Sequence, residues 1–168
     1  ASLTMKQNPE GRRETRLVLD GSTDLATQSI AIDGRQLSHN DYAIEDGKLT
    51  LFDLPEQFVL ETDVTIKPQH NKSLSGLYQS GDMFCTQCEA EGFRNITWYL
   101  DRPDVLSEFT TTITADKAKY PVLLSNGNAQ SREDLGEKHR VTWHDPFLKP
   151  AYLYALVAGD LEFIEDTF

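Results

Sequence analysis

The chain has 168 residues, which is enough for one domain to bury a hydrophobic core without covalent cross-links. Hydrophobic residues make up 39% of it and charged residues 26%, and we expect no membrane span because no apolar run approaches the roughly 18 residues of a membrane helix. The net charge of −11 leaves no basic stripe that could neutralise phosphates, so the sequence also argues against a nucleic acid partner.

Alternating apolar and polar side chains predict strands along the first half of the chain. The predicted strands are residues 15–21, 29–34, 48–54 and 58–68. The dipeptides Asp33-Gly34 and Asp46-Gly47 fall between them, and both accept the positive φ angles of a tight hairpin turn. The first half is therefore expected to be a meander of antiparallel strands.

The second half repeats the same alternation. The predicted strands are residues 109–115, 120–127, 139–146 and 152–166. Residues 151–158 are nearly all apolar and predict a central strand, whereas His144-Asp145-Pro146 is typical of a strand end. Helical pieces are expected only within residues 89–108, with Pro103 in a first turn.

These patterns together predict an all-β fold. We expect a sandwich of twisted, mainly antiparallel sheets with one or two short helical turns. No linker or repeat interrupts residues 1–168, so a single domain is expected.

The two cysteines, Cys85 and Cys88, have the spacing of half a zinc site or of a redox dithiol. No second cysteine pair exists, and the four histidines show no ligand spacing. A redox motif would open a helix in an α/β fold, which this pattern does not resemble. We interpret both as buried small residues of a protein from a reducing compartment, the cytoplasm, and expect no metal site in this chain.

The polar residues around this pair suggest a binding site. In an extended segment Gln87, Glu89 and Glu91 would share one side, and Arg94 could pair with one carboxylate and leave the other free for an ammonium group. The pattern alone favours an ordinary surface salt bridge. No catalytic residue is predicted, because none of the histidines begins an HExxH motif.

Two long segments resemble a known family. GLYQSGDMFCTQCEAEGFRNITWYLDRPDVLSEFTTTITADKAKYPVLLSNGN, residues 76–128, and PFLKPAYLYALVAGDLEF, residues 146–163, are similar to the amino-terminal domain of the bacterial aminopeptidases N. These are alanyl aminopeptidases among the gluzincin zinc metallopeptidases. The resemblance implies the first domain of a larger cytoplasmic enzyme that removes residues from peptide amino termini, with the first strand truncated.

The resemblance also implies which residues act. The zinc would sit in a thermolysin-like catalytic domain on which this domain packs, and the present chain alone would be inactive. In the family a QxE segment binds the α-amino group of the substrate. By this motif Glu89 would pair with the ammonium and Gln87 would line the first specificity pocket. We interpret Glu91 and Arg94 as residues that orient the loop.

Two other functions are compatible with parts of the sequence. One is a free-standing β-sandwich that binds protein or carbohydrate on a platform of Trp98, Tyr99 and Trp143, although aromatic residues in strands are more often core. The other is a thiol redox protein that uses Cys85 and Cys88.

Overall fold

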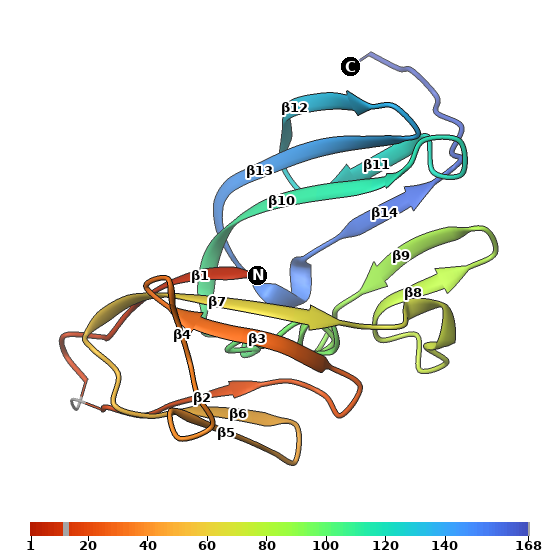
Figure 1. Ribbon diagram of the computed structural model, residues 1–168. Coiled ribbons are helices and arrows are strands. Elements are labelled where there is room, and N and C mark those ends of the chain that lie inside the picture. The colour runs from red at the N-terminus through yellow and green to blue at the C-terminus, as the bar shows by residue number, and fades with distance from the viewer. Residues whose placement is uncertain (12–13, 168) are drawn as a thin grey trace. The chain divides into compact units, whose positions relative to one another are not determined.

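The computed structural model describes residues 1–11 and 14–167 (Figure 1). Every pair of neighbouring strands in it is antiparallel, and the regular structure besides strands consists of short 3-10 turns, so the all-β sandwich is confirmed. The chain forms two compact units: unit 1 holds Ala1–Lys67 and Gly92–Asp101, and unit 2 holds Pro68–Glu91 and the residues from Arg102 onwards. The single domain expected from chain length stays a prediction.

Unit 1 contains two antiparallel sheets. Its strands are β1 (Ser2–Lys6), β2 (Leu17–Asp20), β3 (Ala26–Ile32), β4 (Arg35–Gln36), β5 (Tyr42–Glu45), β6 (Lys48–Leu51) and β7 (Gln57–Thr65). The sheet orders are β1-β7-β3-β4 and β2-β6-β5. The Asp-Gly turns lie where predicted, with positive φ at both residues of each, but β2 pairs with β6 instead of its neighbour β3. The expected simple meander is therefore wrong.

The core of unit 1 includes a tryptophan that does not belong to any of the strands of this unit. Trp98 is 1% exposed and its indole nitrogen donates to the Thr27 hydroxyl at 2.9 Å. Its ring lies 2.1 Å from the position that a Cβ at Gly21 would occupy, so only glycine fits there. Segment 92–101 thus belongs to the core of unit 1, although β8 and β9, which precede it, belong to unit 2.

Unit 2 is built from two further antiparallel sheets. Its strands are β8 (Gly76–Ser80), β9 (Met83–Gln87), β10 (Leu106–Asp116), β11 (Val122–Ser125), β12 (Asn128–Leu135), β13 (Lys138–Pro150) and β14 (Leu156–Gly159). The sheet orders are β10-β13-β12 and β11-β14-β9-β8 (Figure 1). Ile113 and Val141 of the first sheet pack with Leu123 and Ala158 of the second, which makes the unit a sandwich.

The helical expectation was only partly right. The 3-10 turns are η1 (Pro68–His70), η2 (Phe93–Asn95) and η3 (Ala151–Leu153), and two of them lie outside residues 89–108. Around Pro103 the chain forms a turn, closed by a hydrogen bond of 3.2 Å from the Val105 amide to the Arg102 carbonyl, before β10 begins. None of the described helices is long and apolar enough to cross a membrane.

Two strand predictions in unit 2 need correction. The apolar stretch 152–166 is a strand only over β14, because η3 occupies its start; β14 nevertheless lies centrally, between β11 and β9, as expected. His144-Asp145-Pro146 does not end a strand, since β13 continues to Pro150. Pro146 is tolerated because the pairing of β13 with β12 stops at His144 and the ladder to β10 is irregular beyond Asp145.

An ion pair bridges this irregular stretch of β13. The Lys149 ammonium pairs with the Asp145 carboxylate, and the two side chains are 13% and 8% exposed. The ammonium also lies 5.8 Å from the centre of the Phe109 ring. The hydrogen bond from Lys149 lowers the pKa of Asp145 below its ordinary value, although partial burial opposes this effect.

This pair makes stability depend on pH in a defined direction. Because the folded pKa of Asp145 is lowered, the pair stabilises the fold above the ordinary aspartate pKa of about 3.9 and loses its effect as the pH falls through the folded pKa. Lys149→Met should therefore lower the urea midpoint at pH 7, and the difference from the unchanged chain should shrink at pH 2. Lys119→Met, at an exposed position, is the control. An equal difference at both pH values would contradict this account.

Candidate functional site

The candidate site is the turn that follows β9. Gln87 is the last residue of β9, and residues 89–92 form a turn before η2, so the extended segment assumed from the sequence ends earlier than expected. Gln87, Glu89 and Glu91 are all exposed. Cys88 between them is 2% exposed, so its buried side chain fixes the start of the turn while both neighbours face water.

Gln87 and Glu89 lie close to each other in this turn. The Gln87 side-chain amide donates to the Glu89 carbonyl oxygen at 3.4 Å, and the Glu89–Ala90 peptide bond is cis. Across the ladder from Gln87 lies Gly76, which is buried. Among the described residues, no side chain forms a hydrogen bond or an ion pair with the Glu89 carboxylate. Chemically this is an exposed carboxylate that can accept hydrogen bonds, beside a side-chain amide.

Arg94, five residues further on, is held by an aspartate that the sequence analysis did not single out. Its Nε lies 3.1 Å from Oδ2 of Asp101, its backbone amide donates to the same oxygen at 3.0 Å, and its Nη2 donates to the Asp101 carbonyl oxygen at 2.8 Å. Asp101 is 2% exposed. Asp20 adds a second carboxylate, 3.8 Å from Nη1, and accepts from the Asp101 amide. We call these three residues the Arg94 clasp.

The cysteines show no redox or metal geometry. Both are free thiols, and β9 leads into a turn instead of the helix that a redox motif would open. Cys85 faces Tyr78 across the ladder, and a hydrogen bond between their side chains raises the pKa of Tyr78. Among residues 1–11 and 14–167 no group of three or more His, Cys, Asp or Glu side chains could hold a metal ion.

Two histidines and the aromatic residues take structural roles. Nε2 of His139 lies 2.7 Å from the Tyr120 carbonyl oxygen, and Nδ1 of His144 lies 3.1 Å from the Thr110 hydroxyl oxygen, each within hydrogen-bond distance. The two histidines lie on opposite faces of β13. The aromatic platform is wrong: Trp98 and Tyr99 are 1% and 5% exposed, and Trp143 packs against the core of unit 2.

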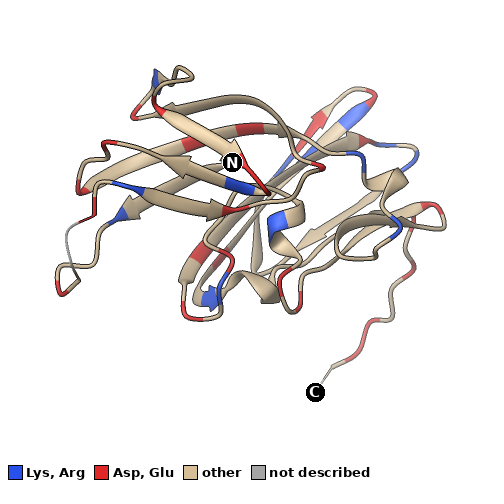
Figure 2. Cartoon of the chain, turned by 90° about the horizontal axis from the view of Figure 1, so that it is seen from below, with Lys and Arg blue, Asp and Glu red and all other residues tan. Residues whose placement is uncertain are grey.

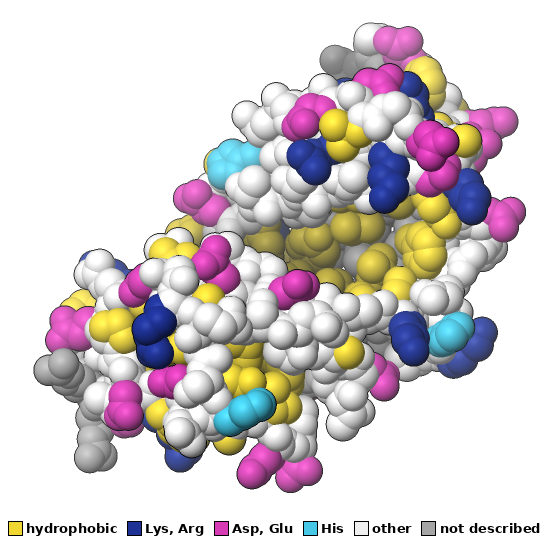
Figure 3. All heavy atoms as spheres, viewed as in Figure 1, with side chains coloured by type: hydrophobic (Ala, Val, Ile, Leu, Met, Phe, Trp, Pro, Cys, Tyr) yellow, Lys and Arg dark blue, Asp and Glu magenta, His cyan; other side chains and the backbone are white. Residues whose placement is uncertain are grey.

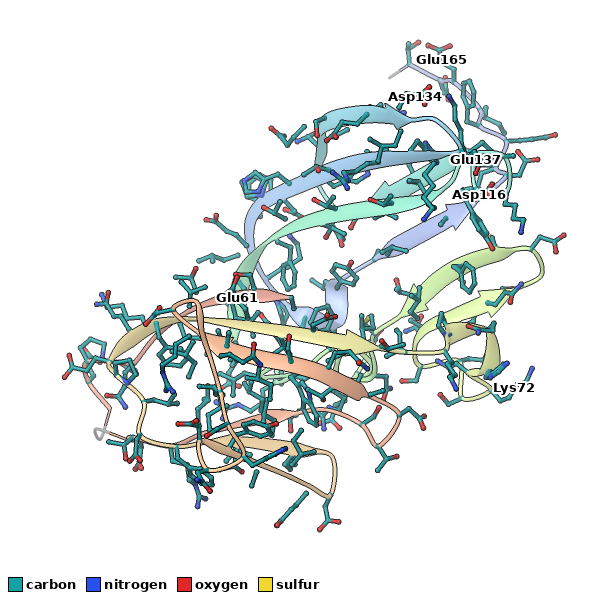
Figure 4. The ribbon with its side chains drawn as sticks, in the orientation of Figure 1. Glu61, Lys72, Asp116, Asp134, Glu137 and Glu165 are labelled. Atoms are coloured by element: carbon teal, nitrogen blue, oxygen red, sulfur yellow. The ribbon has the colours of Figure 1, made fainter. Side chains whose placement is uncertain are left out.

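The other acidic groups are ordinary surface features. Acidic residues are spread along the chain in both units (Figure 2), and side chains of both signs are intermixed over β12 and β13 (Figure 3). Asp116, Asp134 and Glu137 gather where β12 turns into β13 (Figure 4). There Asp134 pairs with Lys117, and Asp116 accepts two backbone amides from the connection between β10 and β11, so both carboxylates already have partners.

Comparison with known proteins assigns this chain to a protein family. The model of the Peptidase M1 N-terminal domain matches residues 2–153, and the chain belongs to this family. It is 53% identical over 159 residues to the aminopeptidase N of Caulobacter vibrioides, covering 94% of this chain and 18% of the relative. It is 60% identical over 125 residues to the aminopeptidase N of Escherichia coli, and this match covers 74% of this chain and 14% of the relative.

Solved structures agree with the family. The Legionella pneumophila aminopeptidase A, crystallised in complex with aspartic acid, is 35% identical and superposes with a TM-score of 0.92 over 96% of this chain and 19% of its own. An M1 zinc metallopeptidase of Deinococcus radiodurans is 18% identical, and its superposition covers 96% of this chain and 37% of its own. The TM-score of 0.79 shows that the two share the fold. The resemblance seen in the sequence is thus confirmed. The chain spans less than a fifth of the length of the aminopeptidases N that it matches.

The Arg94 clasp should contribute strongly to stability. Asp101→Ala would leave the Arg94 guanidinium, 21% exposed, without its main partner, which typically costs about 3 kcal/mol or more for a buried pair. We expect a clear drop in the free energy of unfolding measured with urea, and a smaller one for Asp101→Asn, which keeps an acceptor oxygen. Asp104→Ala, at the exposed pair with Arg102, is the control and should change little. Equal losses of unfolding free energy in Asp101→Ala and Asp104→Ala would contradict a stabilising role of the Arg94 clasp.

Proposed function

We propose that this chain is the substrate-anchoring first domain of a zinc-dependent aminopeptidase. In this proposal the parent enzyme removes amino acids one at a time from peptide amino termini, and Glu89 binds the α-ammonium group of the substrate. The observation that carries the proposal is the exposed Glu89 carboxylate, which no described side chain neutralises, in a domain of the M1 family. The relatives named aminopeptidase N support the reaction class.

A fixed carboxylate provides the selectivity that an exopeptidase needs. The α-amino terminus of a peptide is an ammonium, whereas every internal nitrogen is a neutral amide. Once the rest of the parent enzyme covers this exposed carboxylate, its pairing in a partly dry cleft favours the ammonium, because an internal peptide would leave the covered carboxylate without a partner. The bound aspartic acid of the Legionella relative carries the same α-ammonium group, which supports a site of this chemistry.

Gln87 completes the anchor in this proposal. Its amide donates to the Glu89 carbonyl oxygen within the same turn, so Gln87 lies beside the anchor and would line the place of the first side chain of the substrate. In this proposal Glu91 and Arg94 have the supporting role of orienting the loop. For Arg94 this role is supported by its bonds to Asp101, which tie the chain down just after the turn.

The chemistry of bond cleavage belongs to a domain outside this chain. We propose that a catalytic domain of the parent holds the zinc ion, which would polarise the scissile carbonyl and activate water. The present chain would contribute substrate binding and packing against that domain, without catalytic residues of its own. A cytoplasmic location in a bacterium, expected from the free cysteines and the resemblance, belongs to the same proposal.

The 168-residue chain alone should be inactive. It should bind no stoichiometric zinc at neutral pH and release no product from aminoacyl anilides, because its described residues offer no metal site. Metal analysis after dialysis and an anilide assay at high protein concentration would test this. Stoichiometric zinc, or turnover that a chelator abolishes, would mean that part of the catalytic machinery lies in this chain.

Glu89→Ala in the parent enzyme tests the anchor. Losing a charge pair of this kind typically costs about 2 kcal/mol or more, so kcat/KM for unblocked aminoacyl substrates should fall by at least about 30-fold while the zinc content stays unchanged. Residual hydrolysis of amino-acetylated substrates, which carry no ammonium, should change little.

Glu137→Ala is the matched control for this experiment. It removes an exposed glutamate from a turn of the same unit and should leave the kinetics unchanged. If Glu89→Ala and Glu137→Ala behave alike, the ammonium group is bound elsewhere.

A further inference from the structure

Thr86 is a polar side chain on the inner side of β9, directly before the candidate site. Residues two apart along a strand share a face, so Thr86 lies on the same face as Phe84, which packs against the core of unit 2. Cys88, two residues further on, is 2% exposed. An apolar side chain such as valine is the usual choice at a half-buried position of this kind. The hydroxyl of Thr86 therefore needs a hydrogen-bond partner.

The partner of this hydroxyl is the backbone of Leu156, the first residue of β14. The Leu156 amide donates to Oγ1 of Thr86 at 2.9 Å, and Oγ1 donates to the Leu156 carbonyl oxygen at 3.4 Å. One side chain thus provides both an acceptor and a donor for a residue that lies 70 positions further along the chain. Removing the hydroxyl would take a partner from two backbone groups at once.

These bonds lie where the two strands stop pairing. The ladder between β14 and β9 ends with Val157 opposite Cys85, and in the same register Leu156 would face Thr86 next. There the Thr86 hydroxyl bonds to the backbone groups that a further ladder pair would use. On its other side β9 is paired with β8 as far as Gln87. Thr86 therefore holds the last part of β9 against β14, just before the chain turns.

The segment to which Thr86 bonds is itself firmly held. Leu156 pairs with Ser125 of β11. The Ser125 hydroxyl donates to the Ala155 carbonyl oxygen at 2.8 Å, and the Asn126 side chain accepts from the Ala155 amide at 2.7 Å. The Asn126 side chain also donates to the carbonyl oxygen of residue 153 at 3.0 Å. The hydroxyl on β9 is thus bonded to a part of unit 2 that several other hydrogen bonds fix.

We propose that Thr86 is a positioning residue for the anchor formed by Gln87 and Glu89. The inference rests on the proposed function, in which Glu89 binds the α-ammonium group of the substrate. Gln87 follows Thr86 directly and Glu89 comes three residues after it, and the peptide units between them are planar, so a shift of Thr86 also displaces both side chains. A misplacement of about 1 Å can cost about 100-fold in rate.

Thr86→Val in the parent enzyme tests this role. Valine has nearly the same shape as threonine, but its side chain can neither accept from nor donate to Leu156. We expect kcat/KM for unblocked aminoacyl anilides to fall by at least about tenfold while the zinc content stays unchanged. Thr86→Ser keeps the hydroxyl and should restore kcat/KM to within about threefold of the unchanged enzyme.

Thr112→Val is the matched control. It makes the same chemical change on β10 of the same unit, where the Thr112 hydroxyl is exposed and lies 3.0 Å from the Thr142 hydroxyl. This hydroxyl is bonded to another side chain and not to the strand that carries the anchor. The control should therefore leave the kinetics unchanged.

A double-mutant cycle separates positioning from a general effect on the fold. In Glu89→Ala the anchoring carboxylate is already gone, so adding Thr86→Val should change kcat/KM by less than about threefold. A general loss of folded enzyme would instead lower kcat/KM by the same factor whether or not Glu89 is present.

Thr86→Cys decides the question if the valine variant does not yield folded, zinc-loaded enzyme. A thiol is a weaker donor and acceptor than a hydroxyl, so kcat/KM should be at least about threefold lower than in Thr86→Ser. This difference should again disappear in the Glu89→Ala background. Equal kcat/KM in the cysteine and serine variants would overturn the role of Thr86.

The outcomes distinguish this inference from the proposed function. If Glu89→Ala lowers kcat/KM by about 30-fold but Thr86→Val behaves like Thr112→Val, the anchor stands and the role of Thr86 is overturned. An undiminished loss from Thr86→Val in the Glu89→Ala background has the same meaning. If Glu89→Ala itself leaves the kinetics unchanged, the proposed function fails and the positioning role of Thr86 fails with it.

Discussion

The functional account depends on one unneutralised negative charge. Glu89 sits in a tight turn with a buried neighbour, Cys88, and no described side chain offers it a hydrogen bond or a counterion. Other acidic side chains of the chain do have such partners: Asp101 is paired with Arg94, and Asp20 with Arg94 and Lys48. An exposed carboxylate without a partner among the described side chains is suited to bind a cation from outside the chain.

The turn lies where the chain passes from one compact unit to the other. On one side β9 continues into it from the sheet of unit 2. On the other side Trp98 and the Arg94 clasp fix segment 92–101 in unit 1. Within unit 2 the buried Cys88 side chain holds the start of the turn, which limits the conformations open to Gln87 and Glu89 and lowers the entropic cost of binding a ligand there.

The sequence predicted local features better than pairings. Alternation found most long strands, and the two Asp-Gly dipeptides marked their turns, because both signals depend on neighbouring residues only. The sequence did not predict that β2 pairs with β6 or that β13 continues through Pro146, because both features depend on partners far along the chain. The exposed position of Gln87 and Glu89 could be expected from the motif. The partner of Arg94 could not, because nothing local distinguishes the buried Asp101 from Asp104, the exposed partner of Arg102.

The central claim is that the Glu89 carboxylate contacts the amino terminus of a bound peptide. A crystal structure of the parent enzyme with a peptide or amino acid analogue tests it most directly. The account predicts a Glu89 carboxylate oxygen within about 3 Å of the ligand α-nitrogen, with the Gln87 side chain beside the first residue. A ligand nitrogen bound only by other groups, with Glu89 turned to solvent or paired with an arginine, would contradict it.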